Sequence, residues 1–136
     1  MLIACLDLEG VLFPEVWINV AEKTGITELK LTTRDIADYD ELMGIRLKII
    51  AEKKLTLKDI QDTIASMDPL PGALNFLDWL REECQVIILS DTFDAFARPI
   101  MRKLKMPAIF CHELGVDESN IITSYRLRMN DAKTKA

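Results

Sequence analysis

The first twelve residues of the chain, MLIACLDLEGVL (residues 1–12), place two acids directly after an apolar run. Residues 2–6 have the length and composition of a buried β-strand, and Gly10 supplies a turn signal behind them. Because side chains two residues apart in a strand point to the same side, Asp7 and Glu9 are predicted to leave the strand on one face. Paired carboxylates are costly in an apolar core unless they meet a metal ion, a proton or water. The pattern therefore predicts a site at this strand end.

Length and composition fit one soluble globular domain of 136 residues, 49% hydrophobic and 29% charged. The net charge of −5 and the absence of a basic block argue against a nucleic-acid partner. No apolar run approaches the roughly 18–20 residues of a membrane span, and the N-terminus does not resemble a signal peptide. We therefore expect a cytoplasmic protein without a membrane partner. Cys5, Cys84 and Cys111 are expected to be free thiols, two of them buried.

An all-helical insertion is predicted to follow the first strand. Pro14 opens its first helix, Asp38 caps a second helix and Thr56 caps a third. Residues 68–72, which include two prolines and a glycine, are the strongest break in the chain and end the insertion. We therefore expect a helical cap over residues 15–69.

Helices and strands alternate in the rest of the chain, so residues 1–14 and 70–136 are predicted to form an α/β core. A helix is predicted over about residues 72–83, with Phe76, Leu77 and Leu80 facing inward. It precedes residues 85–90, which are apolar on both faces like a parallel strand between helices. Further strands are predicted at residues 108–111, 113–116 and 121–127, the last two antiparallel. The whole pattern predicts a mainly parallel Rossmannoid sheet with a small helical cap inserted after the first strand.

Two predicted strand ends bring polar side chains to the same edge of this sheet, where ligands of such sheets bind. Asp7 and Glu9 follow one strand; Ser90 and Asp91 follow another, and Asp91 or Thr92 is expected to cap the next helix. A strand-end carboxylate can attack phosphorus, a second acid can protonate the leaving alkoxide, and hydroxyl and N–H groups can hold phosphoryl oxygens. Such chemistry needs Mg²⁺ or another cation to offset the repulsion between carboxylate and phosphate.

Two motifs resemble those of the haloacid dehalogenase (HAD) superfamily. DLEGV at residues 7–11 resembles its first motif, Asp-x-Asp-x-(Thr/Val), and VIILSD at residues 86–91 resembles its second, an apolar strand ending in Ser or Thr. The helical insertion between them matches the cap position of phosphoserine phosphatases. Glu9 replaces the common aspartate, and together with ILSDTF at residues 88–93 it resembles the phosphoserine phosphatase/homoserine kinase subfamily.

The resemblance implies roles for particular residues. Asp7 would be the nucleophile and a Mg²⁺ ligand, and Glu9 the general acid/base and a second ligand. Ser90 and Asp91 would hold the phosphate and the substrate. The other implied substrate contacts are Glu15 and Arg46, which would meet the amino and carboxylate groups of O-phosphoserine from the cap side, and Lys133, which would be the third-motif lysine.

Structural explanations for several of these residues stay open at this point. Ser90 and Asp91 alone also fit a plain helix N-cap, and Glu15 is explained by the helix dipole alone. Arg46 also fits a solvated or ion-paired position on a helix surface. His112, the single histidine, is expected to be structural and not a ligand.

The family's fourth motif, an acidic pair such as Gly-Asp-x-x-x-Asp that completes its Mg²⁺ site, has no counterpart in the sequence. The C-terminal part of the core is expected to be missing, at about 60 residues for two strand–helix units. The first strand would then lie exposed, which predicts marginal stability or self-association, for example as a homodimer.

Three functional hypotheses follow. The first is a Mg²⁺-dependent phosphoserine phosphatase that acts through an aspartyl-phosphate intermediate in serine biosynthesis. The second is a phosphotransferase that moves the phosphoryl group from phosphoserine to homoserine. The third is a catalytically incomplete fragment or binding module that lacks the fourth motif.

Overall fold

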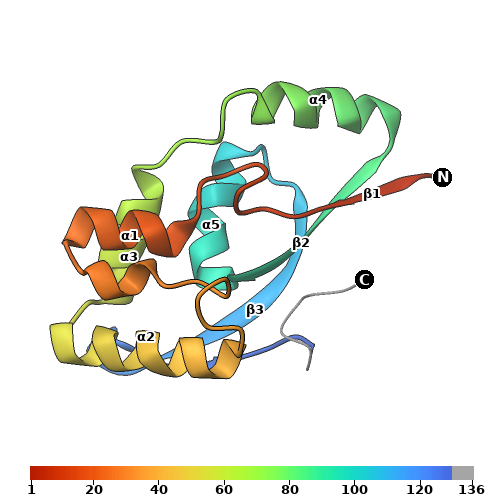
Figure 1. The fold of residues 1–136 in the computed structure, drawn as a ribbon. Helices are drawn as coiled ribbons and strands as arrows, with labels where there is room; N and C mark the ends of the chain where they lie inside the picture. Colours follow the sequence, from red (N-terminus) through yellow and green to blue (C-terminus); the bar gives the residue numbers. More distant parts are fainter. Residues whose placement is uncertain (130–136) are drawn as a thin grey trace.

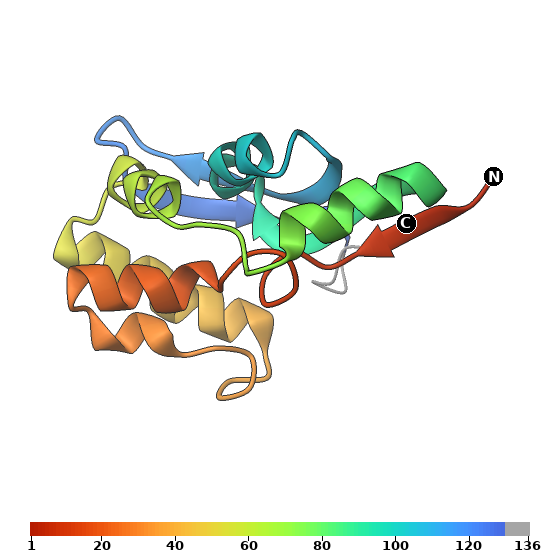
Figure 2. The same cartoon turned by 90° about the horizontal axis from the view of Figure 1, so that it is seen from above.

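A four-stranded sheet and five α-helices make up the part of the chain that the computed structural model describes, residues 1–129. In chain order the elements are β1 (Ile3–Leu6), α1 (Val16–Thr24), the 3₁₀-helix η1 (Thr27–Lys30), α2 (Tyr39–Lys53), α3 (Leu57–Ala65), α4 (Ala73–Glu83), β2 (Gln85–Phe93), α5 (Asp94–Lys103), β3 (Ala108–Val116) and β4 (Ile122–Arg126). In Figures 1 and 2 the carboxyl end of β1 points toward α1, α2 and α3.

The sheet has the strand order β1-β2-β3-β4 and is mainly parallel. β2 pairs in parallel with β1, where Cys5 faces Ile87, and with β3, where Ile88 faces Ile109; β3 and β4 are antiparallel. α5 lies between this sheet and the helices α1 and α3 (Figure 1). The predicted mainly parallel α/β architecture is therefore confirmed.

Two helices of the insertion, α2 and α3, begin at residues whose side chains accept capping hydrogen bonds. Thr56 and Asp59 form a reciprocal capping box at α3: the Asp59 N–H donates to Thr56 Oγ1 over 3.1 Å, and the Thr56 N–H donates to Asp59 Oδ2 over 3.0 Å. The Asp38 carboxylate accepts the Glu41 N–H at the start of α2 over 3.0 Å. Both predicted N-caps are confirmed.

β2 is longer than predicted, because it continues through Asp91 and Thr92 to Phe93. α5 begins at Asp94 with Phe93 at its N-cap, so the prediction that Asp91 or Thr92 caps this helix is wrong. The Thr92 N–H donates to Ser90 Oγ over 3.1 Å, and the pairing with β3 shifts register between Leu89 and Phe93. This local irregularity extends the strand past the polar residues that signalled its end.

β3 is also longer than predicted, since it runs without a break through His112. The His112 ring is fully buried, its Nδ1 accepts the Arg128 N–H over 2.9 Å, and its Nε2 lies 3.1 Å from Asp91 Oδ1. Because both ring nitrogens have partners, the histidine can stay inside the strand.

The edge of β1 and one face of α4 are exposed among the described residues. Leu2 and Ile3 are 77% and 56% exposed, as expected for an uncovered first strand. Phe76 and Trp79 are 41% and 55% exposed, so the prediction that Phe76 faces inward is wrong. The prediction for Leu77 is confirmed, because Leu77 is fully buried and Ala73 is buried beside it on α4. All three cysteines are free, but Cys5 is exposed and the other two are half-buried, which corrects the expectation of two buried thiols.

Among residues 1–129, no helix combines the length and the apolar character that a membrane crossing requires.

The open edge of β1 generates a prediction about association. The 136-residue chain is expected to self-associate as its concentration rises, and Ile3→Lys is expected to weaken this association, because a charged side chain on an edge strand opposes strand pairing. Sedimentation velocity over a concentration series measures it. Met106→Lys, at a 68% exposed position away from the edge, is the matched control. A wild-type chain that stays monomeric throughout, or equal effects of both substitutions, would contradict the prediction.

Candidate active site

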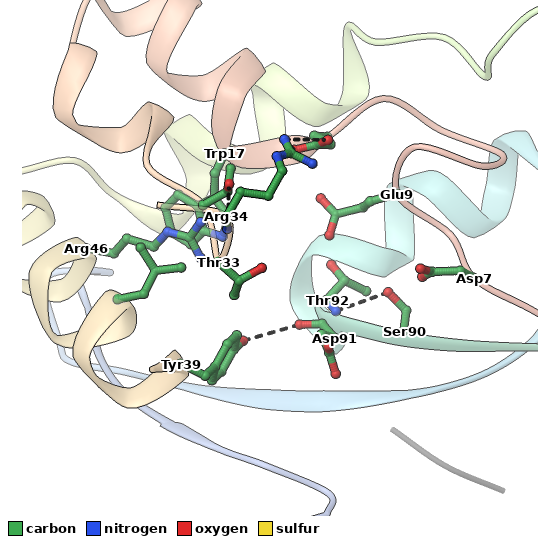
Figure 3. A pocket seen from close by; sticks show the side chains of 13 residues that line it. Asp7, Glu9, Trp17, Thr33, Arg34, Tyr39, Arg46, Ser90, Asp91 and Thr92 are labelled. Carbon is green, nitrogen blue, oxygen red and sulfur yellow. Dashed lines mark hydrogen bonds and ion pairs between the residues drawn. The ribbon is translucent and has the colours of Figure 1, made fainter. Parts of the chain in front are cut away.

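A cavity of about 270 Å³ lies at the carboxyl ends of β1 and β2, beneath the helical insertion (Figure 3). It gathers six of the side chains that the sequence singled out: Asp7, Glu9, Glu15, Arg46, Ser90 and Asp91. Lys133, the seventh, lies outside the described residues.

The turn after β1 presents the two acids to this cavity. Leu8 is fully buried, and it separates Asp7 and Glu9 so that both carboxylates leave on the opposite side. Gly10 has a φ of 78°, a left-handed conformation that a side chain would strain, and its N–H donates to the Phe13 carbonyl over 2.7 Å. The chain thereby reverses directly after the acids and enters α1.

Glu9 reaches the start of α1, where its Oε1 accepts the Val16 N–H over 2.7 Å. Burial raises the pKa of Glu9 from 4.5 to about 7, although the Val16 hydrogen bond and the charge of Arg46 act in the opposite direction. A carboxyl group with a pKa near neutral can both give and take a proton under physiological conditions. Glu9 is therefore suited to general acid/base chemistry.

Arg46 is a buried cation, only 6% exposed, on α2. Its guanidinium lies 4.7 Å from the ring centroid of Trp17, and its Nη2 donates to the Leu31 carbonyl over 2.9 Å. Burial lowers the pKa of Arg46 to about 10, so the group stays charged at neutral pH. Its Nε has no hydrogen-bond partner among the described residues. The solvated-surface alternative is therefore wrong, and a buried charge with a spare donor can receive an anionic group.

Glu15 is the N-cap residue of α1, but its side chain makes no capping hydrogen bond. Its carboxylate instead forms an ion pair with Arg34 Nη2, at 3.3 Å, and both residues line the cavity. Arg34 comes from the loop before α2 and is mostly exposed. The Glu15 carboxylate therefore lies at the cavity, where a cationic group of a ligand can replace the exposed Arg34 as its ion-pair partner.

Ser90 and Asp91 lie side by side at the end of β2. Ser90 is buried and its Oγ accepts the Thr92 N–H, as described above. The Asp91 carbonyl accepts a hydrogen bond from the Tyr39 hydroxyl over 3.3 Å, and its carboxylate is held 3.1 Å from His112 Nε2. Burial raises the pKa of Tyr39, so its hydroxyl keeps its proton. Asp91 is thus tied to both the insertion and β3.

Sequence reasoning missed several residues of this cavity, chiefly Tyr39, Thr92 and Arg34. Thr92 carried a usable signal, because it stands two residues after Ser90 and side chains at that spacing share a face of a strand. The loop that carries Arg34 has no periodic pattern, and nothing in the sequence indicates that it returns to the strand ends.

The carboxylates of Asp7 and Glu9 offer two neighbouring ligands to a metal ion. Within residues 1–129, no group of three or more His, Cys, Asp and Glu side chains is arranged to hold one. Mg²⁺ is commonly held by one or two protein carboxylates, with water and substrate phosphate completing its shell. The hard oxygen donors of Asp7 and Glu9 fit that partial ligand set.

The chain resembles curated phosphatases in sequence, although no family model matches it. The chain is 57% identical over 136 residues to phosphoserine phosphatase ThrH of Pseudomonas aeruginosa (strain PAO1). The matched region spans all of this chain and 66% of that protein. The chain is also 57% identical over 134 residues to a phosphoserine phosphatase of Pseudomonas syringae pv. tomato. The matched region spans 98% of this chain and 56% of that protein. The chain therefore spans no more than 66% of either relative.

Solved structures show the same fold at lower sequence identity. A phospho-aspartyl intermediate analogue of phosphoserine phosphatase matches with a TM-score of 0.73 and 17% identity, covering 92% of this chain and 62% of that one. Phosphoserine phosphatase from T. onnurineus, in complex with NDSB-201, matches with a TM-score of 0.68 and 22% identity, covering 94% and 64%. A HAD-family hydrolase from Salmonella enterica serovar Typhi gives a TM-score of 0.71 at 16% identity, covering 93% and 45%.

The raised pKa of Glu9 generates a prediction about stability. Between pH 4.5 and about 7 the folded chain keeps a proton on Glu9 that the unfolded chain has lost, so the free energy of unfolding falls as pH rises through this window. Glu9→Gln cannot titrate and is expected to remove this fall. The variant should be more stable than the wild type at pH 8, by at most about 3 kcal/mol, and should lose this advantage near pH 4.

Urea unfolding at pH 4, 6 and 8, with a chelator present, measures this difference. Glu118→Gln, in the exposed turn between β3 and β4, is the control and should leave the pH profile unchanged. Parallel pH profiles for the wild type and Glu9→Gln would refute the prediction.

Proposed function

Since this chain is a homologue of phosphoserine phosphatases and has their haloacid dehalogenase fold, we propose that it carries the catalytic site of a phosphatase for O-phosphoserine. The observation that carries the proposal is the meeting, in one cavity, of Asp7, the near-neutral Glu9 and the buried cation of Arg46. Nucleophile, proton donor and anion receptor are the functions that cleavage of a phosphorylated amino acid requires.

Asp7 is the proposed nucleophile. One of its carboxylate oxygens attacks phosphorus and forms a new P–O bond, while the bond from phosphorus to the serine oxygen breaks. Glu9, protonated at this stage, gives its proton to the departing serine alkoxide. Its raised pKa supports this role, because a fully ionised carboxylate has no proton to give.

Hydrolysis of the aspartyl phosphate uses the same two side chains. Glu9, now ionised, takes a proton from a water molecule as that water attacks phosphorus. The bond between phosphorus and Asp7 breaks, inorganic phosphate leaves, and Glu9 holds its proton for the next turnover. Asp7 and Glu9 are also the proposed Mg²⁺ ligands. Glu9 would hold the ion through the carboxyl oxygen that carries no proton, and the ion would offset the repulsion between Asp7 and the phosphoryl oxygens.

The substrate is proposed to lie across the cavity between the strand ends and the insertion. Arg46 receives its carboxylate, Glu15 receives its ammonium group in exchange for Arg34, and Ser90 and Asp91 hold the phosphoryl end. In this arrangement the insertion, proposed as a cap over residues 15–69, recognises the amino acid, and the core performs the chemistry. Lys133 is retained as the proposed third-motif lysine.

The nucleophile assignment is tested by phosphate release from O-phosphoserine in the presence of Mg²⁺. Asp7→Asn is expected to lower kcat by about a thousandfold or more, because the amide cannot form the covalent intermediate. Asp62→Asn, at an exposed carboxylate on α3, is the control and should retain the wild-type rate. An Asp7→Asn variant that keeps wild-type turnover would rule out the mechanism.

The same assay separates the other hypotheses. With homoserine present, the phosphotransferase hypothesis requires phosphohomoserine to appear. A folded wild-type chain of 136 residues without turnover, beside an active full-length relative, would support the incomplete-fragment hypothesis.

The role of Arg46 is tested by a substrate without a carboxylate. Arg46→Lys is expected to raise the KM for O-phosphoserine about tenfold or more, since the lysine ammonium cannot reproduce the planar pair of guanidinium donors. The KM for phosphoethanolamine should stay within about twofold, because that substrate offers no carboxylate to lose. Arg102→Lys, exposed on α5, is the control. Equal rises for both substrates would refute carboxylate recognition by Arg46.

A further inference from the structure

Thr92 has a buried hydroxyl group that the fold leaves without a partner. The residue is 3% exposed, and its Oγ1 makes no hydrogen bond to any described residue. Its backbone N–H is occupied, because it donates to Ser90 Oγ over 3.1 Å. A buried hydroxyl without a partner carries a desolvation cost, and in native proteins such a group calls for an explanation.

The position of Thr92 supplies that explanation. Thr92 follows Ser90 by two residues in β2, and both side chains line the cavity. Figure 3 shows the Thr92 side chain between Glu9 and Ser90, on the side of the cavity that holds Asp7. The unpartnered hydroxyl therefore lies at the end of the cavity where the phosphorus atom must sit to be attacked by Asp7.

The charges around Thr92 favour a role as donor. Asp7 and Asp91 also line this end of the cavity, and a carboxylate offers acceptors only. A phosphoryl group brings further anionic oxygens, which need hydrogen-bond donors. A threonine hydroxyl can rotate to donate, and a hydrogen bond to a charged oxygen is stronger than one between neutral groups.

A second observation indicates how a ligand would lie in the cavity. Among the described residues, the two buried side-chain nitrogen and oxygen atoms without partners are Thr92 Oγ1 and Arg46 Nε. Both side chains line the same cavity, and Figure 3 shows them on different sides of it. A ligand with an anionic group at each end satisfies both atoms at once.

We propose that the Thr92 hydroxyl donates a hydrogen bond to a phosphoryl oxygen of the substrate and is a binding residue for the phosphoryl end. This assignment rests on the proposed function, and it adds a contact that the Ser90-Asp91 pair alone does not supply.

The test compares Thr92→Val, which keeps the shape and removes the hydroxyl, with Thr92→Ser, which keeps the hydroxyl. Calorimetric titrations of the chain with inorganic phosphate and, separately, with L-serine are run in the presence of Mg²⁺. Thr92→Val is expected to weaken phosphate binding about tenfold or more and to leave serine binding within about twofold. Thr92→Ser is expected to bind phosphate within about threefold of the wild type.

Three outcomes would overturn the assignment. The first is a Thr92→Val variant that binds phosphate as tightly as the wild type. The second is a Thr92→Val variant whose affinities for phosphate and for serine fall equally, which would indicate a structural role. The third is a loss of phosphate binding in Thr92→Ser as large as that in Thr92→Val. Serine binding also verifies that each variant is folded.

Failure of the proposed function gives a different pattern. A wild-type chain that binds phosphate but does not cleave O-phosphoserine refutes the function, while the comparison of the two Thr92 variants still decides the role of the hydroxyl. A wild-type chain that cleaves O-phosphoserine, with a Thr92→Val variant equal to it in phosphate binding, refutes the Thr92 assignment alone. A wild-type chain that binds no phosphate overturns both.

Discussion

The backbone turn after β1 is the constraint on which the cavity depends. The Leu8 carbonyl accepts the N–H groups of Leu12 and Phe13 over 2.9 and 3.1 Å, and the Leu8 side chain is fully buried. This arrangement anchors the turn in the core and leaves Asp7 and Glu9 on the open side. The same turn directs the chain into α1, so the acids and the helical insertion are positioned by one short stretch.

Elements governed by local interactions could be predicted from the sequence. The period-two placement of Asp7 and Glu9, the N-caps at Asp38 and Thr56, and the apolar run of β2 all depend on neighbours within a few residues. The meeting of two strand ends at one edge follows from parallel topology. These rules were sufficient to bring Asp7, Glu9, Ser90 and Asp91 to one cavity, whereas Glu15 and Arg46 were expected there only from the family resemblance. The chemical roles of all six residues stay predictions.

Features that depend on distant partners could not be predicted in this way. β2 and β3 run through polar residues because the Asp91 carboxylate and the His112 ring contact each other between the two strands, and no local pattern shows this contact. Phe76 is exposed because the described residues provide nothing to cover its face of α4, which periodicity alone cannot reveal. The loop with Arg34 likewise reaches Glu15 through tertiary structure. Long-range contacts therefore set the limit of the sequence reasoning.

The pairing of β1 with β2 joins segments that lie far apart in the chain, and we expect it to form late in folding. Ile3 must find Gln85, and the whole insertion lies between them in the chain. The contacts within α1, α2 and α3 close much shorter loops, so the insertion can gain structure before the first strand docks. Asp7 and Glu9 are therefore expected to reach Ser90 late in folding. Until then β1 is an unpaired apolar strand, and any chaperone or aggregating neighbour competes with β2 for it.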